Sequence, residues 1–130
     1  MRHAALALVL VTMLASPAAA RVQTKPLKFS AGASSATVSG ALVRGDEDQW
    51  TVGARKGQQL TASVSALEQN AVITIYKPGW KKDADGHPTG ATVKVEATRW
   101  SGALPASGDY LISVDGTRGN ASYKLTVAIK

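Results

Sequence analysis

One arginine near the C-terminal end of the chain offers the clearest recognition chemistry in this sequence. Arg118 stands in the polar run Thr117-Arg118-Gly119-Asn120, between two runs of alternating apolar residues. A guanidinium presents five N–H donors in a fixed fork that matches the two oxygens of a carboxylate. A hairpin loop that displays Arg118 would therefore suit the acidic cleft of a partner. The alternative is an ordinary solvated turn residue.

A tryptophan in a lysine-rich stretch is a second candidate for binding. Trp80 precedes Lys81 and Lys82, in a segment rich in Gly and Pro. An exposed indole beside cations suits the face of a sugar ring or a protein surface. A lid over one end of the fold is the alternative. For Trp100 we favour a role in closing the core.

Two acidic runs raise the question of a calcium site. Asp46 and Asp48 flank Glu47, and Ca²⁺ prefers oxygen ligands. We favour a polar turn instead, in which these carboxylates accept hydrogen bonds from nearby backbone N–H groups. The run DADG at 83–86 has the first steps of a calcium loop but lacks the third ligand position and the distal Glu. We therefore predict no metal and no cofactor.

The groups that usually carry catalysis are scarce. The chain has no Cys, which excludes thiol nucleophiles and thiolate metal sites. After residue 20 the only histidine is His87, and a lone loop histidine is usually solvent-exposed. None of the serines stands in a nucleophile-elbow pattern. We predict that the protein is not an enzyme.

The first twenty residues have the pattern of a secretory signal peptide. Arg2 and His3 precede an almost wholly apolar run at 4–14, and small residues lead to a cut after Ala20. The apolar run is too short for a stop-transfer helix. We predict an exported mature chain of residues 21–130, periplasmic or secreted, forming one domain.

The charge of the chain restricts the partners that we expect. The net charge of +6 becomes +5 without Arg2. A basic exported protein suits anionic glycans, anionic lipids or an acidic protein surface, although solubility explains the charge equally well. Export argues against nucleic acid as a partner. No run after the leader approaches the length of a membrane span.

Period-two alternation runs through the rest of the chain and is broken by Gly, Pro, Asn and Asp, whereas helical periodicity is nearly absent. Pro26 confines the first strand to a sheet edge. The long loop at 77–91 is expected to be the most mobile part. The pattern indicates an all-β fold, an antiparallel β-sandwich or a small barrel. Eight short strands are expected, at 25–29, 36–42, 49–55, 60–65, 71–76, 92–96, 110–114 and 123–129, the last two joined as a hairpin.

The inward-facing positions of these strands define the expected core. Burying each such side chain is worth roughly 1.5–3 kcal/mol. The expected members are Trp50, Leu60, Val64, Ile73 or Tyr76, Val95, Tyr110, Ile112, Val114, Tyr123, Leu125 and Val127.

Three stretches resemble the bacterial pre-peptidase C-terminal domain, an exported β-sandwich of jelly-roll type: GDEDQWTV at 45–52, KGQQL at 56–60 and LPASGDY at 104–110. The chain is still more similar to the periplasmic inhibitors of g-type lysozyme, which share that fold. This second resemblance covers residues 29–129. It rests on Phe29, SSA at 34–36, Ser39-Gly40, ARKGQ at 54–58, LPASG at 104–108 and Thr117-Arg118.

The resemblance implies that loops at one end of the sandwich occlude the glycan cleft of a lysozyme. Arg118 would then pair with the region of the catalytic carboxylates, with Thr117 and Asn120 as polar supports. Ser39 and Gly40 would line the same surface.

Two other functions stay open. The first is a module that binds glycan or peptidoglycan through Trp80. The second is a structural envelope protein with a calcium site at Asp46 and Asp48.

Overall fold

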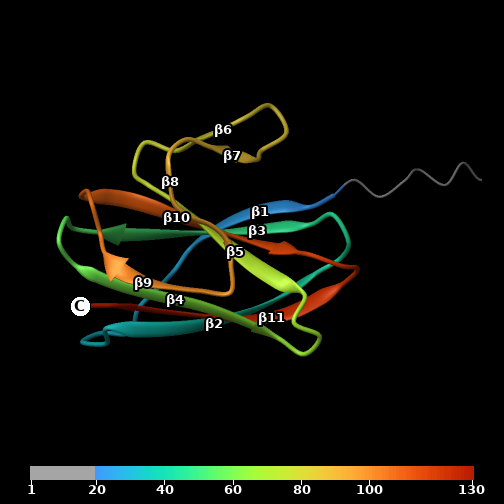
Figure 1. The fold of residues 1–130 in the computed structure, drawn as a ribbon, viewed down its shortest axis with the longest axis horizontal. Coiled ribbons are helices and arrows are strands. Elements are labelled where there is room, and N and C mark those ends of the chain that lie inside the picture. The colour runs from blue at the N-terminus through green and yellow to red at the C-terminus, as the bar shows by residue number, and fades with distance from the viewer. Residues whose placement is uncertain (1–19) are drawn as a thin grey trace, which may run out of the picture.

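The computed structural model describes residues 20–130, and all of its regular structure is β-strand (Figure 1). Five strands form one sheet in the order β1-β3-β10-β5-β8, four form a second sheet in the order β2-β11-β4-β9, and β6 pairs with β7. The predicted all-β sandwich is confirmed. The bounds are β1 Val22–Pro26, β2 Ser35–Leu42, β3 Glu47–Ala54, β4 Gln59–Ala66, β5 Ala71–Tyr76, β6 Lys81–Lys82, β7 Pro88–Thr89, β8 Thr92–Ala97, β9 Arg99–Ala103, β10 Gly108–Gly116 and β11 Ala121–Ile129.

The predicted leader and its cleavage site lie outside the described residues, apart from Ala20. Residues 20–130 contain no helix of the length and apolarity needed to cross a membrane.

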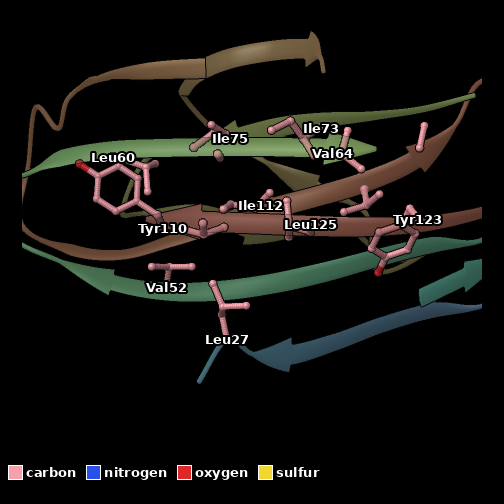
Figure 2. Close-up of a cluster of buried hydrophobic side chains, with 14 of the residues drawn as sticks. Leu27, Val52, Leu60, Val64, Ile73, Ile75, Tyr110, Ile112, Tyr123 and Leu125 are labelled. Atoms are coloured by element: carbon pink, nitrogen blue, oxygen red, sulfur yellow. The ribbon is translucent and has the colours of Figure 1, made fainter. Parts of the chain in front are cut away.

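The core lies between the two sheets and follows the predicted alternation. Tyr110, Ile112 and Val114 point inward from β10 and are almost completely buried. The side chains that meet them from β11 are Tyr123, Leu125 and Val127, which are also buried. Figure 2 shows Tyr110 and Ile112 in this cluster with Leu125 and Tyr123.

Two predicted core residues differ from the structure. Val95 is 55% exposed because it lies on β8, an edge strand of the five-stranded sheet. Trp50 is half-buried, packed against the core, and its indole N–H donates to the Tyr123 hydroxyl at 3.1 Å. Of the two alternatives on β5, Ile73 is the fully buried residue and Tyr76 is half-buried.

Two strands also differ from the prediction. The first strand begins and ends three residues earlier than expected, and it pairs parallel to β3, so that the sheet is mixed. Pro26 ends this edge strand and Leu27 turns into the core. Strand β9 was not expected, because Trp100 and Gly102 give no long alternating run. The Trp100 ring covers Gly102, where a Cβ would lie 2.7 Å from the indole.

The predicted hairpin of the last two strands is wrong. β10 belongs to the five-stranded sheet and β11 to the four-stranded sheet, so loop 117–120 crosses from one sheet to the other. Two strands that face each other across a core alternate in the same way as two strands in a hairpin. The alternation of apolar and polar residues therefore could not distinguish a hairpin within one sheet from a crossover between the two sheets.

The segment expected as a long loop, residues 77–91, contains the β6–β7 hairpin and is called the strap below (Figure 1). Its base is closed by a hydrogen bond from the Lys77 N–H to the Ala91 carbonyl, 2.9 Å long. The strap contacts the outer face of the five-stranded sheet, where the Gly86 carbonyl accepts a hydrogen bond from Gln49 of β3. Leu111 and Ser113, on the outer side of β10, are buried as well.

Candidate functional site

Three connections meet at one end of the sandwich, opposite the C-terminus (Figure 1). They are the turn at 43–46 between β2 and β3, the turn at 67–70 between β4 and β5, and the loop at 117–120 between β10 and β11. We call this group the three-loop end. It contains Thr117, Arg118 and Asn120 from the sequence analysis.

A buried asparagine ties these connections together. Asn70 is 2% exposed, and its side-chain amide donates to the Arg118 carbonyl at 3.0 Å and to the Asn120 carbonyl at 2.8 Å. The backbone carbonyl of Asn70 accepts a hydrogen bond from the Thr117 N–H at 2.8 Å. The third connection joins through Asn120, whose Oδ1 accepts from the Arg44 N–H at 3.0 Å. Sequence analysis did not identify Asn70, because a lone asparagine at a turn is ordinary.

Arg118 is exposed and already has one partner within the protein. Its Nη2 donates to the Glu68 carbonyl at 2.6 Å, which braces the neighbouring turn. A guanidinium has five N–H donors, so the remaining donors are available to a carboxylate of a partner. Thr117 and Asn120 act on the loop itself, through the backbone N–H of Thr117 and the side chain of Asn120.

Two exposed apolar side chains stand on either side of this cationic loop. Val43 is 62% exposed and Leu67 is 99% exposed. In the four-stranded sheet Leu42 pairs with Ala121, and Ala66 pairs with Tyr123. The two turns therefore flank the start of β11. Sequence analysis missed both residues, since a single apolar residue beside a turn has no period.

Ser39 and Gly40 lie on β2, next to the three-loop end. Gly40 pairs with Tyr123, and a Cβ at position 40 would lie 2.5 Å from the tyrosine hydroxyl. The Tyr123 hydroxyl in turn donates to Asp48 at 2.7 Å, which joins the two sheets. Burial and the hydrogen bond to Asp48 raise the pKa of Tyr123, so its proton stays in place. The glycine is thus required by packing.

Ser39 and Gly40 also separate two hollows. A cleft of about 120 Å³ opens between β1, β2 and β3, with Arg21, Lys25 and Trp50 in its wall. A wider groove of about 550 Å³ runs from Leu67 along the four-stranded sheet. The remaining residues lining this groove are Ser39, Gly40, Ser65, Ala66, Ser122, Tyr123 and Lys124.

The acidic run at 46–48 has partners within the protein. Asp46 accepts from the backbone N–H groups of Arg21 at 2.8 Å and Val43 at 3.0 Å, and these bonds lower its pKa. Asp48 accepts from Tyr123, and its other oxygen lies 3.2 Å from the Arg21 guanidinium. Within residues 20–130 no group of three or more His, Cys, Asp or Glu side chains could hold a metal ion.

Trp80 lies on the strap and is not brought together with Arg118. Its indole N–H donates to the Asp109 carbonyl at 3.0 Å, at the start of β10, whereas loop 117–120 follows the end of that strand. A nine-residue strand is about 30 Å long. The ring is half-buried. The structure therefore separates the residue proposed for glycan from the residue proposed for a carboxylate.

A titratable network lies beneath the strap. His87 Nδ1 lies 3.2 Å from a Glu47 oxygen, and this hydrogen bond raises the pKa of His87. The Ser113 hydroxyl lies 2.6 Å from the other Glu47 oxygen and 3.1 Å from Asp115. Burial and the charge of Glu47 raise the pKa of Asp115 to about 6. His87 is exposed, as expected for a loop histidine, but nothing in the sequence indicated its Glu47 partner.

No protein-family model matches this chain, and no curated protein matches its sequence. Among solved structures it is similar to Aeromonas hydrophila PliG, a periplasmic lysozyme inhibitor of g-type lysozyme, at 30% identity over 86% of this chain and 100% of that one, with a TM-score of 0.70. The Salmonella Typhimurium PliG is 27% identical over 83% of this chain and 98% of its own, with a TM-score of 0.60.

A pre-peptidase C-terminal domain of a Bacillus anthracis collagenase shows likeness in fold alone, at 16% identity over 88% of this chain and all 100% of that one, with a TM-score of 0.52. Both resemblances seen in the sequence are therefore confirmed. The likeness to the Aeromonas protein extends over the whole of that inhibitor. The chain belongs to the family of periplasmic inhibitors of g-type lysozyme.

Proposed function

We propose that this protein is a periplasmic, non-enzymatic inhibitor of g-type lysozyme that docks through its three-loop end. The Aeromonas and Salmonella relatives named above are lysozyme inhibitors. The proposal rests on one observation: the buried Asn70, in the turn at 67–70, holds loop 117–120 through hydrogen bonds from its side-chain amide. Three connections held in this way form one preformed surface.

The inhibition is steric and electrostatic. A surface that is already ordered loses little conformational entropy on binding, so more of the contact energy appears as affinity. Glycoside hydrolysis depends on a pair of carboxyl groups in the cleft. Arg44 and Arg118 are exposed at the three-loop end and bring cations to those carboxylates. Occupying the cleft keeps the glycan out.

The first test measures turbidity clearing of a bacterial cell-wall suspension by a g-type lysozyme, with and without residues 21–130. A c-type lysozyme runs in parallel. Slowed clearing with the g-type enzyme alone supports the proposal. Slowed clearing with both enzymes points to masking of the substrate, and hence to glycan binding. No effect on either enzyme contradicts inhibition.

Arg118→Ala is expected to weaken inhibition about 10- to 30-fold, because arginines that pair with a partner carboxylate are frequent hot spots. The inhibition constant against the g-type lysozyme gives the measurement. Arg55→Ala is the matched control, since Arg55 is exposed in the turn between β3 and β4, at the other end of the sandwich. Equal loss in both variants would show that overall charge, and not this loop, sets the affinity.

A further inference from the structure

Leu67 is an apolar side chain that the fold leaves almost wholly in water. It is 99% exposed, whereas the other large exposed apolar residues among residues 20–130, Val43 and Val95, are 62% and 55% exposed. A single exposed leucine is common on protein surfaces and carries no conclusion by itself. Two further features bear on its role: the rigidity of the turn that carries it and the residues that surround it.

The turn that carries Leu67 is held on both sides. Within the turn the Gln69 N–H donates to the Ala66 carbonyl at 3.0 Å, and Gln69 has a φ of 53°, which is rare for a residue other than glycine. The Glu68 carbonyl accepts from the Arg118 guanidinium, and Asn70 is buried. A strained and braced turn fixes the position of Leu67 before any partner arrives.

The surroundings of Leu67 are mostly apolar or neutral, with cations at the edge, and the exposed Glu68 beside it is the one acidic residue of the turn. The groove that begins at Leu67 is lined by three serines, Gly40, Ala66 and Tyr123, and Lys124 is its one charged residue. Arg118 reaches the same turn from the other side. No carboxylate lines the groove. A partner that covers this surface therefore needs an apolar patch bordered by negative charge.

We propose that Leu67 is the apolar anchor of the three-loop end, and that it enters an apolar pocket of the inhibited lysozyme whose rim carries carboxylates for Arg118 and Lys124. This inference rests on the proposed function. It assigns Arg118 a second task, since the same guanidinium holds the Leu67 turn in place. Hot spots of protein interfaces are preformed side chains that fill a pocket and are surrounded by weaker polar contacts.

The test compares the inhibition constants of Leu67→Ala, Leu67→Met and the wild type against a g-type lysozyme. Leu67→Ala is expected to weaken inhibition about 10- to 30-fold, as an anchor of this size would. Leu67→Met, which keeps the apolar volume, should stay within about threefold. The melting temperature should not change, because the side chain is not packed against the protein. Val95→Ala removes an exposed apolar side chain on β8 and is the matched control.

The dependence of inhibition on ionic strength distinguishes the apolar contact of Leu67 from the ionic contacts of Arg118 and Lys124. Inhibition by the wild type and by Leu67→Ala should weaken to the same degree as ionic strength rises, whereas Arg118→Ala and Lys124→Ala should be less sensitive to salt. Inhibition by Leu67→Ala within about twofold of the wild type would overturn the anchor and leave the proposed function intact. A wild type that inhibits no g-type lysozyme would overturn both.

Discussion

The three-loop end and the strap are both irregular parts of this sandwich, but they are fastened by different chemistry. At the three-loop end the connections are joined mainly by asparagine side-chain amides and backbone groups, which do not titrate, and by the Arg118 guanidinium. The one carboxylate that takes part, Asp46, has its pKa lowered by backbone N–H groups and so moved further from neutral pH. The strap is held on the five-stranded sheet by a contact between His87 and Glu47, next to Asp115, together with hydrogen bonds from Gln49 and Trp80.

This difference separates a surface that keeps one shape from a segment whose attachment responds to pH. A neutral hydrogen bond between buried groups has the same strength across the physiological range. A histidine and a carboxyl group with a pKa of about 6 both change charge within that range. We therefore expect inhibition to depend on the three-loop end and pH sensitivity to reside in the strap. Three substitutions test this expectation.

Asn70→Asp should have the largest effect. The substitution keeps the shape of the side chain but removes the N–H donors that reach the Arg118 and Asn120 carbonyls. The loss of two hydrogen bonds, together with a buried carboxyl group left facing two carbonyl oxygens, costs at least about 2 kcal/mol, which lowers the melting temperature by roughly 8 °C or more. Inhibition should fall about tenfold as loop 117–120 loosens.

Thermal unfolding and the inhibition constant measure these two effects. Glu68→Ala is the control, because the exposed Glu68 side chain lies in the same turn and Arg118 bonds its backbone carbonyl. Normal inhibition by a destabilised Asn70→Asp would show that the loops keep their arrangement without this amide.

Asp115→Asn should stabilise the protein at neutral pH. The pKa of Asp115 is raised to about 6, so the folded state retains a proton that the unfolded state has lost between pH 3.8 and pH 6. Stability from this group is therefore complete below pH 3.8 and is lost as pH rises through 6. The neutral amide avoids this loss, which amounts to about 1–2 kcal/mol after solvent screening.

Urea unfolding at about pH 4 and about pH 7.5 tests the sign, with a gain expected only at the higher value. Equal stability of Asp115→Asn and wild type at both values would mean that Asp115 is not buried beside Glu47 as described.

His87→Ala should have the smallest effect, confined to the strap. The pKa of His87 is raised by its bond to Glu47, so its stabilising contribution is present below about pH 6.5 and is lost as pH rises through the folded-state pKa. Hydrogen exchange of residues 77–91 should therefore be faster in the variant than in the wild type near pH 6, and equal near pH 8. A variant that loses inhibition would show that the strap belongs to the docking surface.

Much of the fold follows from the sequence by itself. Alternation identified seven of the strands to within two residues at either end, because a side chain on every second position must either enter the core or face water. Gly40 and Tyr123 were placed on strands for this reason. The motifs that the chain shares with the lysozyme inhibitors also lie in the strands and turns of this scaffold, so they indicated the family correctly.

The arrangement of the strands was decided by the tertiary structure. Period two reports the face that a side chain occupies but not the neighbour of its strand. For this reason the hairpin of β10 and β11 was wrong, and Val95 was placed in the core although β8 lies at an edge.

For the same reason the sequence did not reveal how the three-loop end is assembled. Asn70 bonds to carbonyls 48 and 50 residues further along the chain, and Leu67 lies beside Arg118 because β4 neighbours β11 in the sheet. Contacts of this kind leave no local pattern in the sequence. Chemistry carried by one residue, such as the guanidinium of Arg118, was visible in the sequence alone. Chemistry assembled from several loops became visible when folding brought those loops to one end.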